Sequence, residues 1–327
     1  MSGFPSQSQP AAQFDIAGIG NAIVDVVAPA PEAFLSKHDM RKGGMALIDE
    51  VAADTLYAGM PPGEESSGGS AANTCAVAAS LGSRVAYLGK VADDKLGEAF
   101  RRDITAAGVH FPTPPLVGGA ATARCLILVT PDGQRTMNTF LGACVSFGEN
   151  DVDEALITQS AVLYLEGYLF DPPAAQAAFR RAAAAAHAAG RQVSLSLSDA
   201  FCVDRHRAAF RDLVSRDVDI LFANEAEITS LYEANSFEEA SSAAAADVAI
   251  AALTRSEAGS VILRGGERIV VAAEPATLVD TTGAGDAYAG GFLAGFTGGK
   301  PLPECGRMGS VAAAAVIAHY GARPKRA

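Results

Sequence analysis

The sequence predicts an α/β fold in which helices cover both faces of a parallel sheet. Short apolar, strand-like runs alternate with longer helix-like runs through most of the 327 residues, and this alternation is typical of parallel sheets. The strand-like runs are apolar throughout, as expected for strands that are buried on both faces. Two stretches interrupt the alternation, at about residues 26–57 and 110–138, and they predict a small second sheet.

The individual elements follow from these runs in chain order. Continuous apolar runs predict strands at residues 14–18, 85–89, 162–165, 193–197, 220–223, 261–263 and 269–271. The longer runs between them predict helices at residues 70–81, 94–107, 173–189, 205–215, 225–233, 237–251, 286–296 and 303–319. In the second interruption, the turn Pro131-Asp132-Gly133 follows an apolar run at 122–129 and predicts a β-hairpin.

The two interruptions have two interpretations. A small sheet with a mobile flap covers the ligand in many enzymes, whereas two surface hairpins without a role are the plainer alternative. Residues 14–323 are predicted to form one domain that contains both inserted segments. Residues 1–13 are rich in Ser, Pro and Gln and are predicted to be a flexible leader, and residues 324–327 a tail.

Composition and charge exclude several classes of function. The net charge is −12 and no basic stripe is present, which argues against a nucleic acid or an anionic membrane as partner. No run of 18 apolar residues predicts a membrane span. The five cysteines show no C-x-x-C spacing and no signal sequence precedes them, so we expect reduced thiols and a cytoplasmic protein.

The segment DTTGAGDAYAGGFL at residues 280–293 carries the strongest chemical signal, and we predict that it follows a strand and opens a helix. Gly283 and Gly285 leave backbone N–H groups uncovered at the positive helix end, which suits an anion. A carboxylate at Asp286 would repel that anion unless it accepts a proton from a hydroxyl that attacks a phosphoryl group. The alternative is that Asp286 only stabilises the first helical turn.

Two other segments offer polar groups to a sugar. The sequence SGGSAAN at residues 67–73 combines paired glycines, which allow close approach of a ligand, with Asn73, which both donates and accepts hydrogen bonds. Asp25 follows the first strand and offers a carboxylate to two vicinal hydroxyls. The structural alternatives are that Ser70 caps a helix and that Asp25 belongs to a turn.

Asn224 and Glu227 directly follow the strand at 220–223 and share one face of a helix start. Their oxygen atoms suit Mg²⁺ and its waters, and an acidic first turn that merely stabilises the helix is the equal alternative. The Rossmann glycine fingerprint is incomplete, because Ile23 stands where its third glycine would be. The five histidines show no metal-ligand spacing.

These motifs resemble the PfkB, or ribokinase-like, carbohydrate kinases from about residue 14 to residue 323. Both signatures of that family are present in order, GGSAAN at 68–73 and DTTGAGD at 280–286, with the motif at 224–227 between them. Within the family, the chain is similar to the adenosine kinases in the strings GNAIVD at 20–25, NTFLGAC at 138–144, YLEGY at 164–168 and LFANE at 221–225.

The resemblance implies a ribokinase-like three-layer α/β/α sandwich with a small β-sheet lid. It implies transfer of the γ-phosphoryl group of ATP to the 5′-hydroxyl of adenosine, with Asp286 as catalytic base and an anion hole of Gly283, Ala284 and Gly285. The implied substrate-binding residues are Asn21, Asp25, Gly68, Gly69, Asn73, Phe140, Leu141, Tyr168 and the lid arginine Arg135. The implied ATP-binding residues are Asn224, Thr254, Gly259, Thr282, Gly283 and Gly285, and Asn224 and Glu227 are implied to organise Mg²⁺ through water.

The resemblance also implies a cytoplasmic enzyme of purine salvage, acting as a monomer or homodimer, that uses ATP and Mg²⁺, with K⁺ as a further candidate cofactor. Other acceptors within the family stay open, namely ribose, fructose or another hexose, inosine and guanosine. A nucleoside-binding sensor without catalysis is the alternative from another class. A Rossmann dehydrogenase is a third alternative, against which the broken glycine fingerprint argues.

Overall fold

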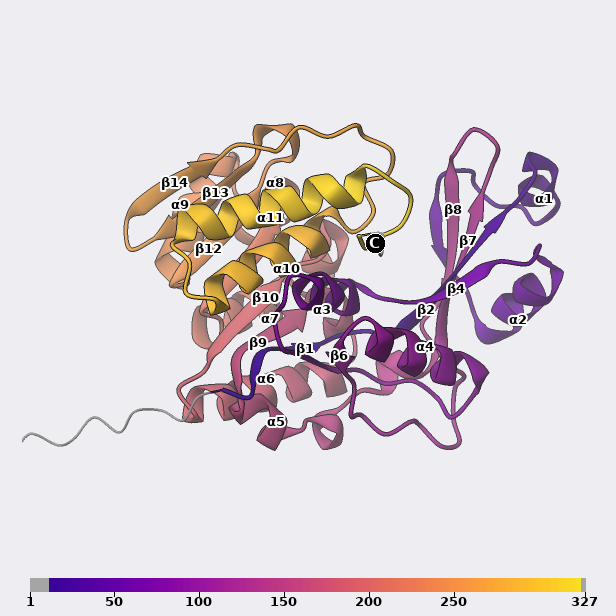
Figure 1. Ribbon diagram of the computed structural model, residues 1–327, viewed down its shortest axis with the longest axis horizontal. Helices are drawn as coiled ribbons and strands as arrows, with labels where there is room; N and C mark the ends of the chain where they lie inside the picture. The colour runs from indigo at the N-terminus through magenta and orange to yellow at the C-terminus, as the bar shows by residue number, and fades with distance from the viewer. Residues whose placement is uncertain (1–11, 325–327) are drawn as a thin grey trace, which may run out of the picture.

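The computed structural model describes residues 12–324 as a three-layer α/β/α sandwich with a second, smaller sheet at one side (Figure 1). The large sheet has the strand order β14-β13-β12-β11-β10-β9-β1-β5-β6. Its strands from β6 to β12 are parallel, and β12, β13 and β14 pair antiparallel. The strands are β1 (Phe14–Ile19), β5 (Val85–Leu88), β6 (Val109–His110), β9 (Ser160–Glu166), β10 (Gln192–Ser196), β11 (Ile220–Asn224), β12 (Ile250–Thr254), β13 (Ser260–Arg264) and β14 (Glu267–Val271).

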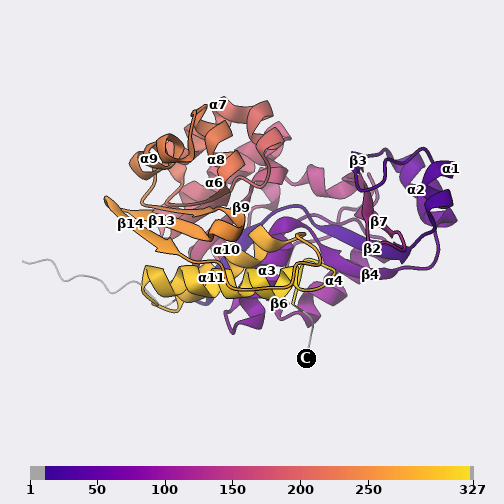
Figure 2. The same ribbon diagram turned by 90° about the horizontal axis from the view of Figure 1, so that it is seen from above.

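Helices cover both faces of this sheet because successive strand residues point to opposite apolar layers. Ala17 of β1 lies in one core cluster with α5–α9, whereas its neighbour Ile16 lies in the other with α3, α4, α10 and α11. Figure 2 shows the two helical layers on either side of the strands. The helices are α3 (Ser70–Ser80), α4 (Lys95–Ala106), α5 (Glu154–Thr158), α6 (Pro173–Ala188), α7 (Ala200–Asp217), α8 (Glu225–Tyr232), α9 (Phe237–Asp247), α10 (Ala284–Thr297) and α11 (Leu302–Ile317).

The second sheet, called the lid here, has the strand order β3-β8-β7-β2-β4. Its strands are β2 (Ile23–Pro29), β3 (Met45–Leu47), β4 (Glu64–Gly68), β7 (Ala123–Val129) and β8 (Arg135–Phe140). Helices α1 (Glu32–Lys37) and α2 (Glu50–Gly59) lie on the face that points away from the sandwich (Figure 1). The chain passes between sandwich and lid four times, from β1 into β2, from β4 into α3, from β6 into β7 and out of β8 toward α5.

All seven predicted strands are present, but β12 was missed and the helix predicted at 237–251 extends too far. Helix α9 ends at Asp247, and the following residues 250–254 form β12 between β11 and β13. Alanine favours helices, and the run from 243 to 252 is rich in alanine, so local propensity gives no stop signal. The pairing of residues 250–254 with β11 and β13 determines that they form a strand.

Three further predictions need correction. The sheet is not parallel throughout, because β13 and β14 return as hairpins. Helix α7 begins at Ala200 rather than residue 205, and it is kinked at His206, whose φ of −127° is not helical. No strand directly precedes the 280–286 segment, since β14 ends at Val271, and α10 begins at Ala284 rather than residue 286.

The predicted leader falls almost wholly on residues 1–11, and the tail on residues 325–327, which lie outside the described part of the chain. Within residues 12–324, no helix combines the length and the apolar character that crossing a bilayer requires.

Candidate active site

The candidate site lies where parallel strands end and helices begin. Strand β1 ends just before Asn21, β9 ends at Glu166 and β11 ends at Asn224, all at one edge of the large sheet. Ligands of open α/β sheets bind at this edge, outside the carboxyl ends of the strands. Helices α3 and α10 contact each other along their length, and hydrogen bonds between their first turns bring the two family signatures together.

Asp286 in the first turn of α10 is held by two residues of α3. The hydroxyl of Ser70 donates to its Oδ1 atom at 2.6 Å, and the amide Nδ2 of Asn73 donates to Oδ2 at 3.1 Å. Burial raises the pKa of Asp286 above its ordinary value, although these two hydrogen bonds and the charge of Arg323 oppose the rise. The carboxyl group is therefore oriented and made more basic than a solvated aspartate.

The glycine loop before α10 has the geometry of an anion site. Gly283 caps the helix with φ of 77°, and a side chain there would meet the Cα atom of Ala322 at 2.7 Å, so only glycine fits. A side chain at Gly285 would meet nothing within 4 Å, which leaves the backbone there open to a ligand. The Ala284 N–H already donates to the Thr281 carbonyl at 3.2 Å. The first-turn amides of a helix have no partner within their own helix, and they favour a negative charge.

Asp25 of β2 lies against the glycine pair that opens α3. The Cβ position of Gly68 falls 2.5 Å from the carboxyl carbon of Asp25, and Gly69, with φ of 96°, lies against the Asn21 carbonyl. Burial raises the pKa of Asp25 to about 6, opposed by the charges of Arg323 and Arg135 and supported by the charge of Asp286. The charge of Arg323 therefore acts on both Asp25 and Asp286, and the charge of Asp286 acts on Asp25.

The strand register shows which lid residues share the open face with Asp25. Asp25 pairs with Cys125, Cys125 with Thr139 and Thr139 with Leu47, and Met45 lies two residues before Leu47 on the same face. The side chains of Met45 and Leu47 are 61% and 63% exposed. These two apolar residues were not predicted for the site, and only the register of β3 identifies them.

Phe140, which the resemblance implies as a substrate-binding residue, does not share the open face of the lid with Asp25. Phe140 pairs with Arg124, so it lies on the opposite face of the lid, where the guanidinium of Arg124 covers its ring at 5.6 Å. Leu141 follows β8 and is half-buried. The structure does not bring Phe140 together with Asp25.

The predicted lid arginine reaches the glycine loop. Arg135 of β8 forms a hydrogen-bonded ion pair with Asp280 and approaches the Thr282 hydroxyl at 3.3 Å. The side chains of Arg135 and Asp280 are only 10% and 8% exposed. Although burial raises the pKa of Asp280, hydrogen bonds from Thr282 and Gly321 and the charge of Arg135 bring it below its ordinary value. This pair ties the lid to the loop that precedes the anion site.

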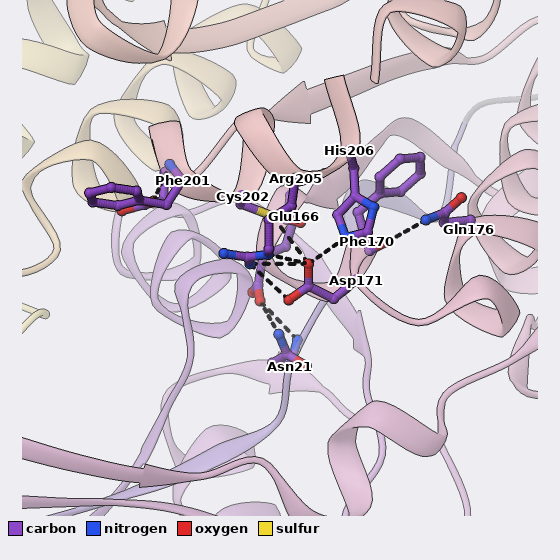
Figure 3. Close-up of polar contacts among 11 residues, drawn as sticks. Asn21, Glu166, Phe170, Asp171, Gln176, Phe201, Cys202, Arg205 and His206 are labelled. Carbon is purple, nitrogen blue, oxygen red and sulfur yellow. Dashed lines mark hydrogen bonds and ion pairs between the residues drawn. The ribbon is translucent and has the colours of Figure 1, made fainter. Parts of the chain in front are cut away.

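Glu166 at the end of β9 fixes the other side of the site and was not predicted as a site residue. Its Oε1 atom accepts from the backbone N and the Nδ2 of Asn21, and its Oε2 atom accepts from the Ala71 N–H at 2.6 Å (Figure 3). Glu166 is 1% exposed, and burial raises its pKa to about 7. The Oδ1 atom of Asn21 is buried without a partner among the described residues.

Tyr168 follows Glu166 in a short helix, η3 (Gly167–Phe170), and its side chain is 43% exposed. Asp171, directly after η3, accepts from Arg205 at 2.9 Å and lies 2.7 Å from the Nε2 atom of His206 (Figure 3). These contacts hold the kinked start of α7 against η3. Burial raises the pKa of the Tyr168 hydroxyl, and the charges of Asp199, Asp286 and Glu227 raise it further.

Asn224 and Glu227 form a reciprocal cap at the start of α8. The Asn224 N–H and Nδ2 donate to the two oxygens of Glu227 at 2.9 and 2.6 Å, and the Glu227 N–H donates back to Asn224 Oδ1 at 2.9 Å. Burial raises the pKa of Glu227 to about 7, helped by the charges of Asp199 and Asp286. Among residues 12–324, no group of three or more His, Cys, Asp or Glu side chains gathers as a metal cage. This donor set fits a magnesium ion that keeps most of its waters.

Thr254 and Gly259 lie beside this cap, at the β12–β13 turn. Thr254 pairs with Asn224 across β11 and β12, which places it at the same edge of the sheet. Gly259 has φ of 83°, and a side chain there would collide with the backbone of β14, so the turn itself requires this glycine.

Comparison with known proteins identifies the family and agrees with the fold. The family model described as pfkB family carbohydrate kinase matches residues 56–326. The crystal structure of adenosine kinase from Sinorhizobium meliloti is 52% identical, covers 96% of both chains and has a TM-score of 0.87. A probable sugar kinase from Rhizobium etli CFN 42 is 49% identical with the same coverage and a TM-score of 0.88. The cytidine kinase of Thermococcus kodakarensis is 28% identical over 85% of this chain and 97% of its own.

Proposed function

The chain belongs to the pfkB family of carbohydrate kinases and is an ATP-dependent kinase, and we propose that its acceptor is the 5′-hydroxyl of adenosine. The observation that carries this proposal is the open face of the lid, which presents the acid Asp25 on β2 and, three strands across on β3, two exposed apolar residues. Asp25 suits the vicinal hydroxyls of a ribose. Met45 and Leu47 offer an apolar surface that a planar base needs and a free sugar does not.

The proposed reaction uses Asp286 as general base. The 5′-hydroxyl loses its proton to the Asp286 carboxylate while its oxygen forms a bond to the γ-phosphorus of ATP. The bond between that phosphorus and the bridging oxygen breaks, and ADP leaves with the electron pair. Ser70 and Asn73 hold the carboxylate, and in this proposal the backbone N–H groups of Gly283 and Gly285 stabilise the charge that develops on the phosphoryl oxygens.

We assign the magnesium ion of the nucleotide to the Asn224–Glu227 cap, held through water. Magnesium bound to the phosphates neutralises the charge that develops during transfer. Glu227 and Asn224 already share three hydrogen bonds, which fix both side chains before a ligand arrives. Thr254 at the end of the neighbouring strand lies on the ATP side of this proposal, and Thr282 lies at the glycine loop.

The lid contributes the exclusion of water in this proposal. Arg135 joins the lid to the Asp280 loop through a buried ion pair, so a closed lid shields the reacting groups. Shielding strengthens the electrostatic interactions inside the site and limits the wasteful hydrolysis of ATP.

A second acceptor is favoured by one finding, since a relative that covers most of this chain is named a cytidine kinase. The test is a panel of adenosine, inosine, guanosine, cytidine, ribose and fructose with ATP, scored by ADP release and by the phosphorylated product. We expect the highest kcat/KM with adenosine and AMP as the product. A higher kcat/KM with cytidine or with a free sugar would refute adenosine as the acceptor, and tight adenosine binding without AMP would indicate a sensor.

A further inference from the structure

The segment that follows α11 completes the site from the C-terminal side. The Gly321 N–H donates to the Oδ2 atom of Asp280 at 3.2 Å, and Ala322 packs against Gly283 so closely that no side chain fits there. Residues 321 and 322 thus support the glycine loop from behind. The next residue, Arg323, extends to the other family signature.

Arg323 connects three separate elements. Its Nε donates to the Oδ1 atom of Asn73 on α3 at 2.9 Å, and its Nη1 donates to the Ser67 hydroxyl of β4 at 2.7 Å. Asp103 of α4 lies 3.6 Å from Nη1 and accepts from Ser67 at 2.6 Å. Arg323 is largely buried by these contacts. The hydrogen bonds and the ion pair described here link Arg323 to Asn73, Ser67 and Asp103 rather than to Asp286, so its effect on that carboxyl acts through Asn73 and through charge.

The chemistry of the guanidinium determines which way the Asn73 amide points. A guanidinium has donors and no acceptor, so Asn73 must turn its oxygen toward Arg323. The Nδ2 group of the same amide then faces Asp286, where it donates at 3.1 Å. If the amide were reversed, its oxygen would face the carboxylate, and two acceptors would repel each other.

We propose that Arg323 is a positioning residue for phosphoryl transfer: it orients the Asn73 amide so that this amide holds Asp286 in place as the acceptor of the substrate proton. The inference rests on the role proposed above for Asp286. It adds a residue from the end of the chain that lies outside both family signatures, and it explains why an arginine is buried among Ser67, Asn73 and Asp103.

The electrostatic surroundings give this proposal a readout that packing alone would not change. The charged or titratable groups that interact electrostatically with Asp286 are Arg323 from the C-terminal segment, Asp25 from β2, Glu166 and Tyr164 from β9, Tyr168 from η3 and Glu227 from α8. Of these, only Arg323 is cationic. Removing its charge raises the pKa of Asp286, so the acid limb of the kcat/KM profile moves to higher pH.

The experiment compares Arg323→Gln, Arg323→Met and Arg323→Lys with the control Arg307→Gln, whose arginine is exposed on α11 and pairs with Glu304. Glutamine has both a donor and an acceptor end, so it no longer determines the orientation of the Asn73 amide, whereas lysine keeps donors and the positive charge. We expect kcat to fall roughly 10- to 100-fold in Arg323→Gln and Arg323→Met, as for loss of one hydrogen bond to a carboxylate. Arg323→Lys should recover most of this loss and keep the acid limb in place.

Thermal unfolding and circular dichroism of each variant against Arg307→Gln show that the chain is folded. Wild-type kcat and an unmoved acid limb in folded Arg323→Gln would overturn the proposal. Equal losses in Arg323→Lys and Arg323→Met without movement of the acid limb would also overturn it, because packing alone would then explain them. If Asp286→Asn keeps its turnover, the proposed function fails as well. If Asp286→Asn is inactive while Arg323→Gln is normal, only the present inference fails.

Discussion

Glu166 allows a quantitative prediction, because a buried carboxyl group with a raised pKa makes stability depend on pH. Its pKa rises from 4.5 to about 7 in the folded chain, which converts to about 3 kcal/mol. The folded state binds the proton more tightly than the unfolded state. The extra stability is therefore fully present below pH 4.5 and is lost as the pH rises through about 7.

The substitution Glu166→Gln removes this titration and keeps the shape of the side chain. One end of glutamine still accepts from Asn21, but its Nε2 group faces the Ala71 N–H, so the variant is destabilised by about 1–3 kcal/mol at low pH. Because the wild type loses about 3 kcal/mol on going to high pH, the variant should be at least as stable as the wild type at pH 8.

The assay is urea unfolding of both proteins at pH 5 and pH 8, with circular dichroism as the signal. Glu227 titrates in the same range with a pKa of about 7, but it is common to both proteins and cancels in the comparison. We expect the fall in unfolding free energy between the two pH values to be about 2.5 kcal/mol smaller in Glu166→Gln. Equal falls in the two proteins would refute the reasoning.

Four further predictions follow from the site. Asp25→Asn should lower kcat/KM for the acceptor roughly 100-fold, as for the loss of two hydrogen bonds to a charged group. In the wild type, the acceptor KM should rise as the pH falls below the Asp25 pKa of about 6. An unchanged kcat/KM in Asp25→Asn counts against the ribose contact. Arg135→Met should cost about 1–3 kcal/mol in urea unfolding, because Asp280 stays buried; unchanged stability argues against the lid pair. Gly69→Ala should cost at least about 1 kcal/mol because φ is 96° there; an unaffected urea midpoint contradicts this. EDTA should abolish ADP release and added Mg²⁺ restore it; full activity in EDTA excludes the metal.

The sequence predicts those parts of the site that depend on local backbone chemistry. Glycine at 69 and 283 is required by positive φ and by close contacts, and the acidic residue at 286 follows a glycine loop at a helix start. These features are encoded within a few residues, so the motifs predict them directly. The alternation of apolar runs likewise predicts the layered sheet, and the comparisons confirm the fold class.

The parts that were missed depend on distant pairing. Glu166 lies 145 residues from Asn21, and Arg323 lies 250 residues from Asn73, so no local pattern links them. The opposite faces of Phe140 and Asp25 depend on strand register, which a hairpin motif alone does not specify. Met45 and Leu47 belong to a strand of three residues, and only its pairing with β8 places them on the same face of the lid as Asp25.

The role of Asp286 as the proton acceptor is tested by the turnover of Asp286→Asn with saturating ATP and adenosine, alongside adenosine binding by calorimetry. Asparagine keeps the size of the side chain but cannot take up the proton of the 5′-hydroxyl. The proposed chemistry predicts that kcat falls by about 10²- to 10⁴-fold while adenosine affinity stays near that of the wild type. Turnover close to the wild-type value in the folded variant would contradict it.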